Sequence, residues 1–342
     1  MKNKKYTYIN EIIRITYKCN WKCKFCNVLK TNNFWNKDIE SKEVIYKILS
    51  LVKRYSKIQR KHLTVSLSWW EPTLDKNLWN YIKLLKEVWI WNVQIQTNWT
   101  NLFKDKELIN KYIKYWLDEI FLAQHWNIDE INKKMWIYYN QDDFKNWILY
   151  IITNGINKKV KINLNIVVNK INIIYMYDYM SYLNKIRFLE ILTLKFWINQ
   201  KEISFWFVQP NWYAYLNKEN ILLKYTDEEI KEIDKVVKLC KENKILLDFH
   251  FTAPPLCVLN YPEYNLEYEK LEKLEQNKIN WDINEANLKS YEFLWKEKTK
   301  FEECRECKYN NYCLWFYKNW IDFVWKIYVK EKINKFITNK NV

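Results

Sequence analysis

The chain has 342 residues, a formal net charge of +16, eight Cys, 20 Trp and a single Gly. A chain of this length can form one large domain, or one domain with a small appendage; it has no run of about 18 apolar residues and no apolar stretch behind its basic N-terminus, so we expect a cytoplasmic protein without a membrane span. The charge excess consists mainly of Lys scattered among Asn, Ile and Tyr, which favours a solvated surface and leaves a binding surface for RNA or an acidic peptide as the alternative.

Apolar alternation and short apolar runs predict six strands along the first 200 residues. They lie at about 12–16, 63–68, 92–97, 119–123, 160–168 and 188–196. Helical patterns lie between them, at about 76–88, 105–115, 142–152 and 172–186, and a first one begins at Ser41. In that first helix, the residues expected to share one apolar face are Val44, Ile45, Ile48, Leu49 and Val52. Strands that alternate with helices predict repeated βα units on a parallel sheet.

The pattern changes after residue 197. Residues 198–224 are rich in aromatic side chains and resemble a loop, and Thr226 to Glu229 form a capping box that predicts the start of a helix. A short strand is expected at 245–249 and a charged, helical stretch at about 263–300. We therefore divide the chain into a core at 1–200, a connecting segment at 201–250 and a cysteine-containing extension at 251–342.

The scarcity of glycine needs a separate explanation. Ordinary globular chains contain about 7% Gly, which corresponds to roughly two dozen residues here, and turns require Gly where φ is positive. The number of Trp is close to this expectation, and Trp99 and Trp212 each follow Asn, where a turn usually has Gly. We hypothesise that most of these Trp are UGA codons from a lineage that translates UGA as glycine. The alternative is a protein that is truly rich in Trp.

Three cysteines follow the first predicted strand directly. Cys19, Cys23 and Cys26 have the spacing C-x3-C-x2-C. In a cytoplasmic protein, cysteines are more often ligands or catalysts than disulfide partners. Three thiolates on one loop can hold three irons of a [4Fe-4S] cluster and leave the fourth iron open for a substrate or cofactor. A zinc site or a chance trio is the alternative.

This loop after the first strand of a βα series resembles the radical S-adenosylmethionine (SAM) superfamily. The resemblance implies a partial (β/α)6 TIM-like barrel, and therefore an α/β fold with a small C-terminal extension. It also implies that SAM binds the open iron and is cleaved reductively to methionine and a 5′-deoxyadenosyl radical. The electron would come from an external donor such as flavodoxin or ferredoxin.

Two further segments are similar to motifs of this family. The family has G-G-E-P after its second strand, where this chain has Trp69, Trp70, Glu71 and Pro72. It has T-N-G-T after its third strand, where this chain has Thr97, Asn98, Trp99 and Thr100. The resemblance implies that the residues at 69–71 and 97–99 of these segments bind SAM: Trp69, Trp70, Glu71, Thr97, Asn98 and Trp99. The same exchange of Trp for Gly would complete both motifs, whereas the literal sequence predicts that Trp69 or Trp70 crowds the space above the three cysteines.

Two single residues are weaker candidates for cofactor binding. His125 follows the fourth strand, where related enzymes place substrate or SAM contacts, and a purely structural role is the alternative. Asn169 follows the fifth strand, where the family places a polar residue near the SAM ribose.

The extension contains a second group of cysteines. Cys304, Cys307 and Cys313 have the spacing C-x2-C-x5-C, and Cys257 brings the number of thiols to four. This arrangement resembles the C-terminal extensions called SPASM or twitch domains, which implies a second [4Fe-4S] cluster; four thiolates would also satisfy a structural zinc. Cys240 lies on the apolar face of its predicted helix, where packing is the simplest role.

The resemblance implies an oxidoreductase or maturase that acts on a peptide or protein. Two alternatives are a small-molecule enzyme related to the molybdopterin-precursor synthase and an RNA-modifying enzyme. Outside catalysis, the alternative is a cysteine-rich metal-binding protein without SAM chemistry.

Overall fold

A computed structural model describes the chain apart from several gaps. The described residues are 9–26, 39–68, 70–125, 129–135, 141–192, 194–195, 200–208, 212–249, 254–259, 261, 298–307, 310, 313, 316–324 and 326–340. The chain divides into two compact units. Unit 1 comprises Met1–Cys23, Lys30–Ile166 and Ser181–Glu202, and unit 2 comprises Lys24–Leu29, Val167–Met180 and Ile203–Val342.

Unit 1 is built on parallel strands that follow one another in sequence. They are β1 (Ile9–Arg14), β2 (Leu63–Ser68), β3 (Asn92–Thr97), β4 (Glu119–Ala123) and β5 (Lys161–Val168), which continues into unit 2. Each strand pairs in parallel with its successor, so their C-terminal ends meet at one edge. Beyond β5 the strand order of the sheet continues with β7 and β6, and β8 pairs with β7.

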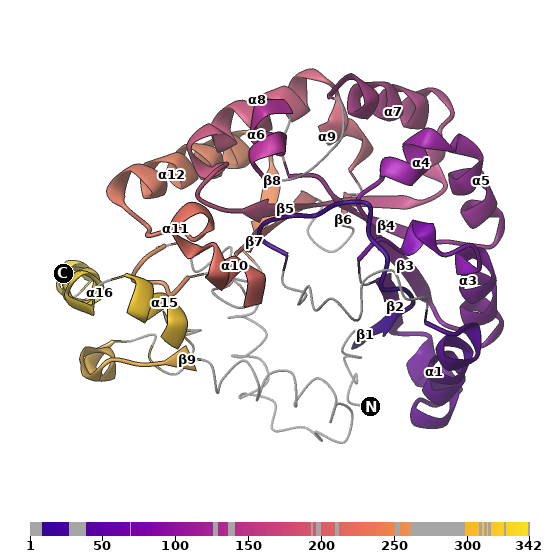
Figure 1. The fold of residues 1–342 in the computed structure, drawn as a ribbon, viewed down its shortest axis with the longest axis horizontal. Helices are drawn as coiled ribbons and strands as arrows, with labels where there is room; N and C mark the ends of the chain where they lie inside the picture. Colours follow the sequence, from indigo (N-terminus) through magenta and orange to yellow (C-terminus); the bar gives the residue numbers. More distant parts are fainter. Residues whose placement is uncertain are drawn as a thin grey trace, which may run out of the picture. The chain divides into compact units, whose positions relative to one another are not determined.

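Helices connect these strands and cover one face of the sheet in unit 1 (Figure 1). They are α1 (Ser41–Arg54), α2 (Lys57–Arg60), α3 (Leu78–Glu87), α4 (Thr100–Lys104), α5 (Lys106–Lys114), α6 (Asp129–Lys134) and α7 (Gln141–Thr153). Short 3-10 turns lie at Pro72–Leu74 and Ile156–Lys158. The strand–helix alternation and the parallel pairing confirm the predicted α/β class, a partial TIM-like barrel with a cysteine-containing C-terminal extension.

The two faces of this sheet differ in polarity. The face toward the helices is formed by fully buried aliphatic residues such as Val65, Ile95 and Leu122, each of which stabilises the fold by about 1.5–3 kcal/mol. The opposite face, which we call the inner face, carries polar side chains. There Gln94 donates to Glu119 at 2.6 Å and accepts a hydrogen bond from Ser66.

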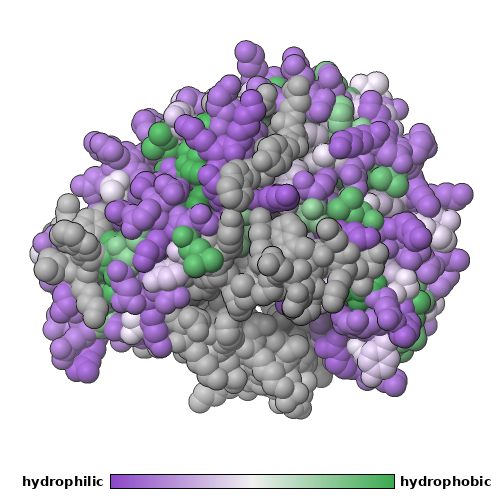
Figure 2. Space-filling view, viewed as in Figure 1, coloured by the Kyte–Doolittle hydropathy of each residue, from purple (hydrophilic) through white to green (hydrophobic). Residues whose placement is uncertain are grey.

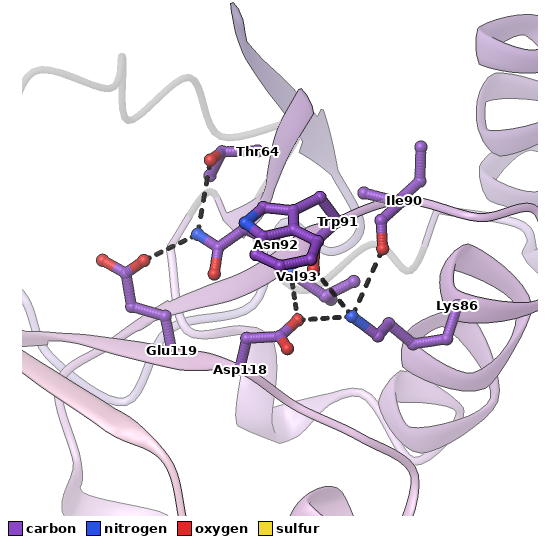
Figure 3. Close-up of polar contacts among 8 residues, drawn as sticks. All are labelled: Thr64, Lys86, Ile90, Trp91, Asn92, Val93, Asp118 and Glu119. Carbon is purple, nitrogen blue, oxygen red and sulfur yellow. Dashed lines mark hydrogen bonds and ion pairs between the residues drawn. The ribbon is translucent and has the colours of Figure 1, made fainter. Parts of the chain in front are cut away.

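The N-terminal ends of β3 and β4 are fixed by a polar network (Figure 3). Lys86 Nζ, in the last turn of α3, donates to the carbonyl of Trp91 and to Asp118 Oδ2, both at 2.8 Å. Asp118 Oδ2 in turn accepts from the Val93 N–H at 2.7 Å, and Asn92 Nδ2 donates to Glu119 Oε2 at the same distance. These contacts set the register of the two strands at the edge opposite to their C-terminal ends.

The apolar stripe of α1 differs from the one expected. Val44 and Ile48 are buried as predicted, but Leu49 is 44% exposed and Val52 is 39% exposed, and Leu51 takes their place in the core. The helix is rotated relative to the expected stripe, because apolar residues occur around more of its circumference than one face can bury.

The sixth predicted strand, at 188–196, is wrong in most of its length. Residues Phe188–Ile191 form the short helix α9, and among the described residues of this segment only Leu194–Lys195 form a strand, β6. A longer strand, β7 (Gln200–Phe207), lies where a loop was expected and pairs antiparallel with β6. A short apolar run fits a buried helix as well as a strand, so periodicity alone could not separate them.

Unit 2 contains the connecting segment and the extension. Its elements are η3 (Ile173–Tyr175), α8 (Met176–Lys185, which ends in unit 1), α10 (Trp212–Leu216), α11 (Lys218–Ile221), α12 (Asp227–Glu242), β8 (Ile245–Asp248), β9 (Lys298–Thr299), η5 (Glu302–Glu306), β10 (Phe316–Tyr317), α15 (Lys318–Phe323) and α16 (Lys326–Lys340). The predicted capping box is confirmed, since the Thr226 side chain accepts from Glu229 N and the Glu229 side chain accepts from Thr226 N. Nearly all of the expected helical stretch at 263–300 lies outside the described residues.

The described surface is mostly hydrophilic on the face shown in Figure 2. Among the described helices, none is both long and apolar enough to cross a membrane.

Candidate functional site

The cysteine loop leaves the C-terminal end of β1. Ile15 and Thr16 are fully buried and anchor its start, while Cys19, Cys23 and Cys26 are half-buried. Cys19 Sγ accepts a hydrogen bond from the Trp21 N–H at 3.4 Å. Cys19 and Cys23 belong to unit 1, and Cys26 lies in the short segment Lys24–Leu29, which is assigned to unit 2.

This loop is hydrogen-bonded to the ends of the next two strands. The carbonyl of Lys18 accepts from the Glu71 N–H at 3.0 Å, in the loop after β2. Asn20 Oδ1 accepts from Asn98 Nδ2 at 2.6 Å, and Trp21 Nε1 donates to Thr100 Oγ1 at 3.1 Å, both after β3. The structure therefore brings the cysteine loop together with both segments that resemble family motifs.

Glu71 is the centre of a buried hydrogen-bond network. Its side chain is fully buried, and its carboxylate accepts from the Asn98 N–H at 2.7 Å and from Thr97 Oγ1 at 2.7 Å. Thr73 adds a backbone N–H at 3.1 Å and its hydroxyl. Burial raises the pKa of Glu71, and these hydrogen bonds act in the opposite direction. The side chain therefore fixes the loop after β3.

Trp70 adopts a conformation that is unusual for a residue with a side chain. Its φ is 59°, in the left-handed region, and its ring packs edge-on against Tyr17 at 5.1 Å. Tyr17 lies two residues before Cys19, so the Trp70 ring packs against the residues that lead into the cysteine loop. Trp69 lies outside the described residues.

Trp99 has the same backbone conformation but is fully buried. Its φ is 58°, and its ring lies 5.0 Å from that of Phe144 and 6.1 Å from that of Trp147. Trp99 Nε1 donates to Gln124 Oε1 at 3.1 Å. The indole thus fills space between the end of β3, the end of β4 and α7.

His125 lies next to the cysteine loop, at the end of β4. Its side chain is buried, and its ring lies 5.9 Å from that of Trp21. Burial lowers its pKa to about 3, so the imidazole is neutral at physiological pH. A neutral imidazole can donate or accept a hydrogen bond to a ligand without adding charge.

Asn169 lies in unit 2, and its side chain forms hydrogen bonds within its own loop. Its Oδ1 accepts from the Ile171 N–H at 2.9 Å, and its Nδ2 donates to the carbonyl of Val167 at 3.2 Å. These bonds account for the burial of the side chain without a cofactor.

Sequence analysis did not single out several polar residues that complete the site. Thr73 holds Glu71, Gln124 holds Trp99, and Asn20 and Thr100 join the cysteine loop to the end of β3. Thr100 ends the segment that resembles T-N-G-T, and the other three lie next to a cysteine, to a motif residue or to another candidate residue, which is the only signal that the sequence contained.

The four cysteines of the extension line one cavity in unit 2. Burial raises the pKa of Cys257 well above its usual value, and the nearby thiols of Cys313, Cys304 and Cys307 add to this effect. The residues that complete the lining are Leu256, Thr299, Lys300, Asn310, Phe316 and Ile333. Four thiols around one cavity fit an iron-sulfur cluster by their chemistry, and so would a zinc ion.

Two observations limit the metal sites. Cys240 is buried on α12, outside this cavity, and burial raises its pKa to about 12, as expected for a packing residue. Within the part of the chain that the structure describes, no group of three or more His, Cys, Asp or Glu side chains has the arrangement needed to hold a single metal ion.

The chain was compared with known families and structures. A family model described as the Radical SAM superfamily matches residues 13–180. No curated protein matches the chain.

Three solved structures illustrate the likeness. Streptococcus suis SuiB bound to precursor peptide SuiA has a TM-score of 0.52 at 16% identity, covering 75% of this chain and 52% of SuiB. HydG, a maturase of the [FeFe]-hydrogenase, has a TM-score of 0.51 at 14% identity over 72% of this chain and 52% of HydG. Native anSMEcpe with bound AdoMet and Cp18Cys peptide has a TM-score of 0.56 at 13% identity over 98% of this chain and 99% of that chain.

The chain thus spans about half the length of SuiB, at 52%. At these identities the structural likeness establishes a shared fold. The family match covers β2, β3 and β4 together with the loop of Cys19, Cys23 and Cys26. Residues 13–180 are therefore similar to the Radical SAM superfamily, and the structures share its fold.

Proposed function

We propose that this chain is a radical SAM enzyme in which Cys19, Cys23 and Cys26 hold a [4Fe-4S] cluster. The proposal rests mainly on one observation, the hydrogen bonds that join Lys18, Asn20 and Trp21 to the segments after β2 and β3. When bound, the cluster and SAM supply an electron and a 5′-deoxyadenosyl radical that removes a hydrogen atom from the substrate.

The residues around the loop have separate roles in this proposal. The main chain at 69–71 receives the SAM amino group, and Glu71 holds Thr97 and the Asn98 N–H in place for the cofactor. His125, neutral and buried beside Trp21, offers a hydrogen bond to the cofactor or substrate. The buried aromatic side chains exclude water from the radical.

The cluster proposal can be tested by electron paramagnetic resonance. After anaerobic reconstitution with iron and sulfide and reduction with dithionite, we expect a cluster signal that changes when SAM is added. Cys23→Ala should lose this signal, whereas Cys240→Ala, which alters a buried cysteine outside both groups, should keep it. A signal in the parent protein that SAM leaves unchanged would argue against an open iron.

We further propose that Trp70, Trp89, Trp99 and Trp116 stand where the natural protein has glycine. Seven described residues other than Gly have a positive φ, and these four Trp are the majority of them. Trp89 and Trp116 end helices α3 and α5, and they are 55% and 62% exposed. Neither side chain belongs to the buried core, although the Trp89 ring contacts the Lys57 ammonium at 3.9 Å. Inspection of the codons decides the matter, because UGG at these positions would exclude the proposal.

The one glycine of the chain supports this interpretation. Gly155, with a φ of 60°, follows helix α7 and donates its N–H to the carbonyl of Ile152 at 3.1 Å. Trp89 and Trp116 occupy the corresponding position after their helices and make the corresponding bonds, to Lys86 at 3.0 Å and to Ile113 at 2.9 Å. This is the helix-ending position at which glycine is strongly enriched.

We also propose a second [4Fe-4S] cluster in the extension, held by Cys257, Cys304, Cys307 and Cys313. The shared cavity of these thiols supports the proposal. Metal analysis of the reconstituted chain tests it: about eight irons are expected for two clusters. About four irons together with one zinc would instead support a structural zinc site.

The substrate that we favour is a peptide or protein, with flavodoxin or ferredoxin as the electron donor. The structures of SuiB and anSMEcpe were both determined with a bound peptide, and the extension with four cysteines resembles SPASM or twitch domains. A short peptide gene beside the gene for this chain would support peptide maturation. Its absence, together with turnover of a small molecule or RNA, would contradict it.

A further inference from the structure

Lys300 is the one cationic side chain among the described residues that line the cysteine cavity. The remaining lining consists of four thiols, two neutral polar residues and three apolar residues. The apolar part of the wall keeps the local dielectric constant low, so that a charge acts on the cavity more strongly than it would in water.

The structure holds the Lys300 ammonium in place. Its Nζ donates to the carbonyl of Asn310 at 2.7 Å, and the Asn310 N–H donates to the carbonyl of Cys307 at 2.8 Å. Lys300 directly follows β9, in which Thr299 pairs with Phe316 of β10. The cation is therefore tied to the turn that carries Cys307 and to the strand pair beside the cavity.

Among the described residues, the charges near the cavity differ in their effect. The positive charge of Lys300 acts on the Cys304 thiol in the same cavity wall. Glu303 has the opposite effect, but it forms an ion pair with Lys330 at 2.8 Å. Lys298, two residues earlier, directs its ammonium over the Tyr317 ring at 4.6 Å.

We propose that Lys300 raises the reduction potential of the centre held by these four cysteines. Reduction adds one electron from an external reductant and therefore one negative charge, and a fixed cation in a low-dielectric wall stabilises that charge. No bond is formed or broken in this step. The inference rests on the proposed second cluster, for which Lys300 is a tuning residue and not a ligand.

A redox titration of the reconstituted full chain, followed by electron paramagnetic resonance, tests the inference. At a fixed potential, Lys300→Met should lower the ratio of reduced to oxidised second cluster about tenfold, which corresponds to a shift of 59 mV for one electron. Lys300→Arg keeps the charge and should stay close to the parent. Lys318→Met removes an equal charge from an exposed site outside the cavity lining and should also stay close to the parent.

Each outcome decides the matter. An equal potential in Lys300→Met and Lys318→Met, with iron content unchanged, would overturn the inference and leave the proposed second cluster intact. A parent chain that binds only the first cluster would overturn both. Loss of the second cluster in both Lys300 variants would show that Lys300 is needed for assembly, and would overturn the tuning role.

Discussion

At the scale of single residues, the backbone conformation of Trp89 and Trp116 carries a measurable cost. A side chain in the left-handed region costs about 1–2 kcal/mol relative to glycine. In the chain with the printed sequence, Trp89→Gly or Trp116→Gly should therefore raise the free energy of unfolding by about 1 kcal/mol, as measured by urea denaturation. Trp147→Gly is the control. Because Trp147 is buried in a helix, its loss should lower the free energy of unfolding by about 3 kcal/mol or more. A loss of stability in the first two variants would contradict the proposed glycines.

The carboxylate of Glu71 gives a second prediction. Glu71→Gln turns one acceptor of the network into an NH2 group that faces N–H and O–H donors. We expect a loss of about 1–3 kcal/mol in the free energy of unfolding. Glu43→Gln, on the exposed face of α1 where Glu43 pairs with Lys47, should change it by less than about 0.5 kcal/mol. Equal effects in the two variants would argue against a central role for Glu71.

His125 makes stability depend on pH in a defined window. Its pKa is about 3 in the folded chain against 6.5 as the ordinary value. Below pH 6.5 the unfolded chain therefore binds a proton that the folded chain does not. As the pH is lowered from 6.5 to about 3, the free energy of unfolding falls by roughly 1.4 kcal/mol for each pH unit. His125→Gln should flatten this slope, measured by urea denaturation at several pH values.

At the scale of elements, the sequence predicted helices and strands well where the local pattern of residues was enough to identify them. Strands β2, β3 and β4 have the predicted bounds, because each is a run of strand-forming residues between clear breaks. The prediction of a strand at 188–196 was wrong because its apolar run fits a helix as well as a strand. The pairing of β7 in the sheet decided which residues form the strand. The alternation of buried Ile203, Phe205 and Phe207 was the signal that could have identified β7.

The capping box of α12 supplies the prediction at this scale. Thr226→Ala removes the hydroxyl that accepts from Glu229 N, and should lower the free energy of unfolding by about 1 kcal/mol. Thr338→Ala, in an exposed part of α16, is the matched control. Thermal or urea unfolding of the two variants would separate them, and equal stabilities would show that the box contributes little.

For the molecule as a whole, the sequence predicted which residue types take part in the site but not how they are held. The loop of Cys19, Cys23 and Cys26 and the grouping of the four later cysteines followed from spacing. The contacts of Glu71 with Thr73, and of Trp99 with Gln124, depend on how separate loops meet in three dimensions. Spacing along the chain contains no information on such contacts.

The central claim, that the chain cleaves SAM at the loop of Cys19, Cys23 and Cys26, is tested most directly by measuring 5′-deoxyadenosine. The chain with Gly at positions 69, 70 and 99 should form it from SAM after anaerobic reconstitution and reduction with dithionite. The same chain with Cys23→Ala should not, and the chain with the printed sequence should form less. If the glycine-containing chain holds its cluster and binds SAM but releases no 5′-deoxyadenosine, the account is contradicted.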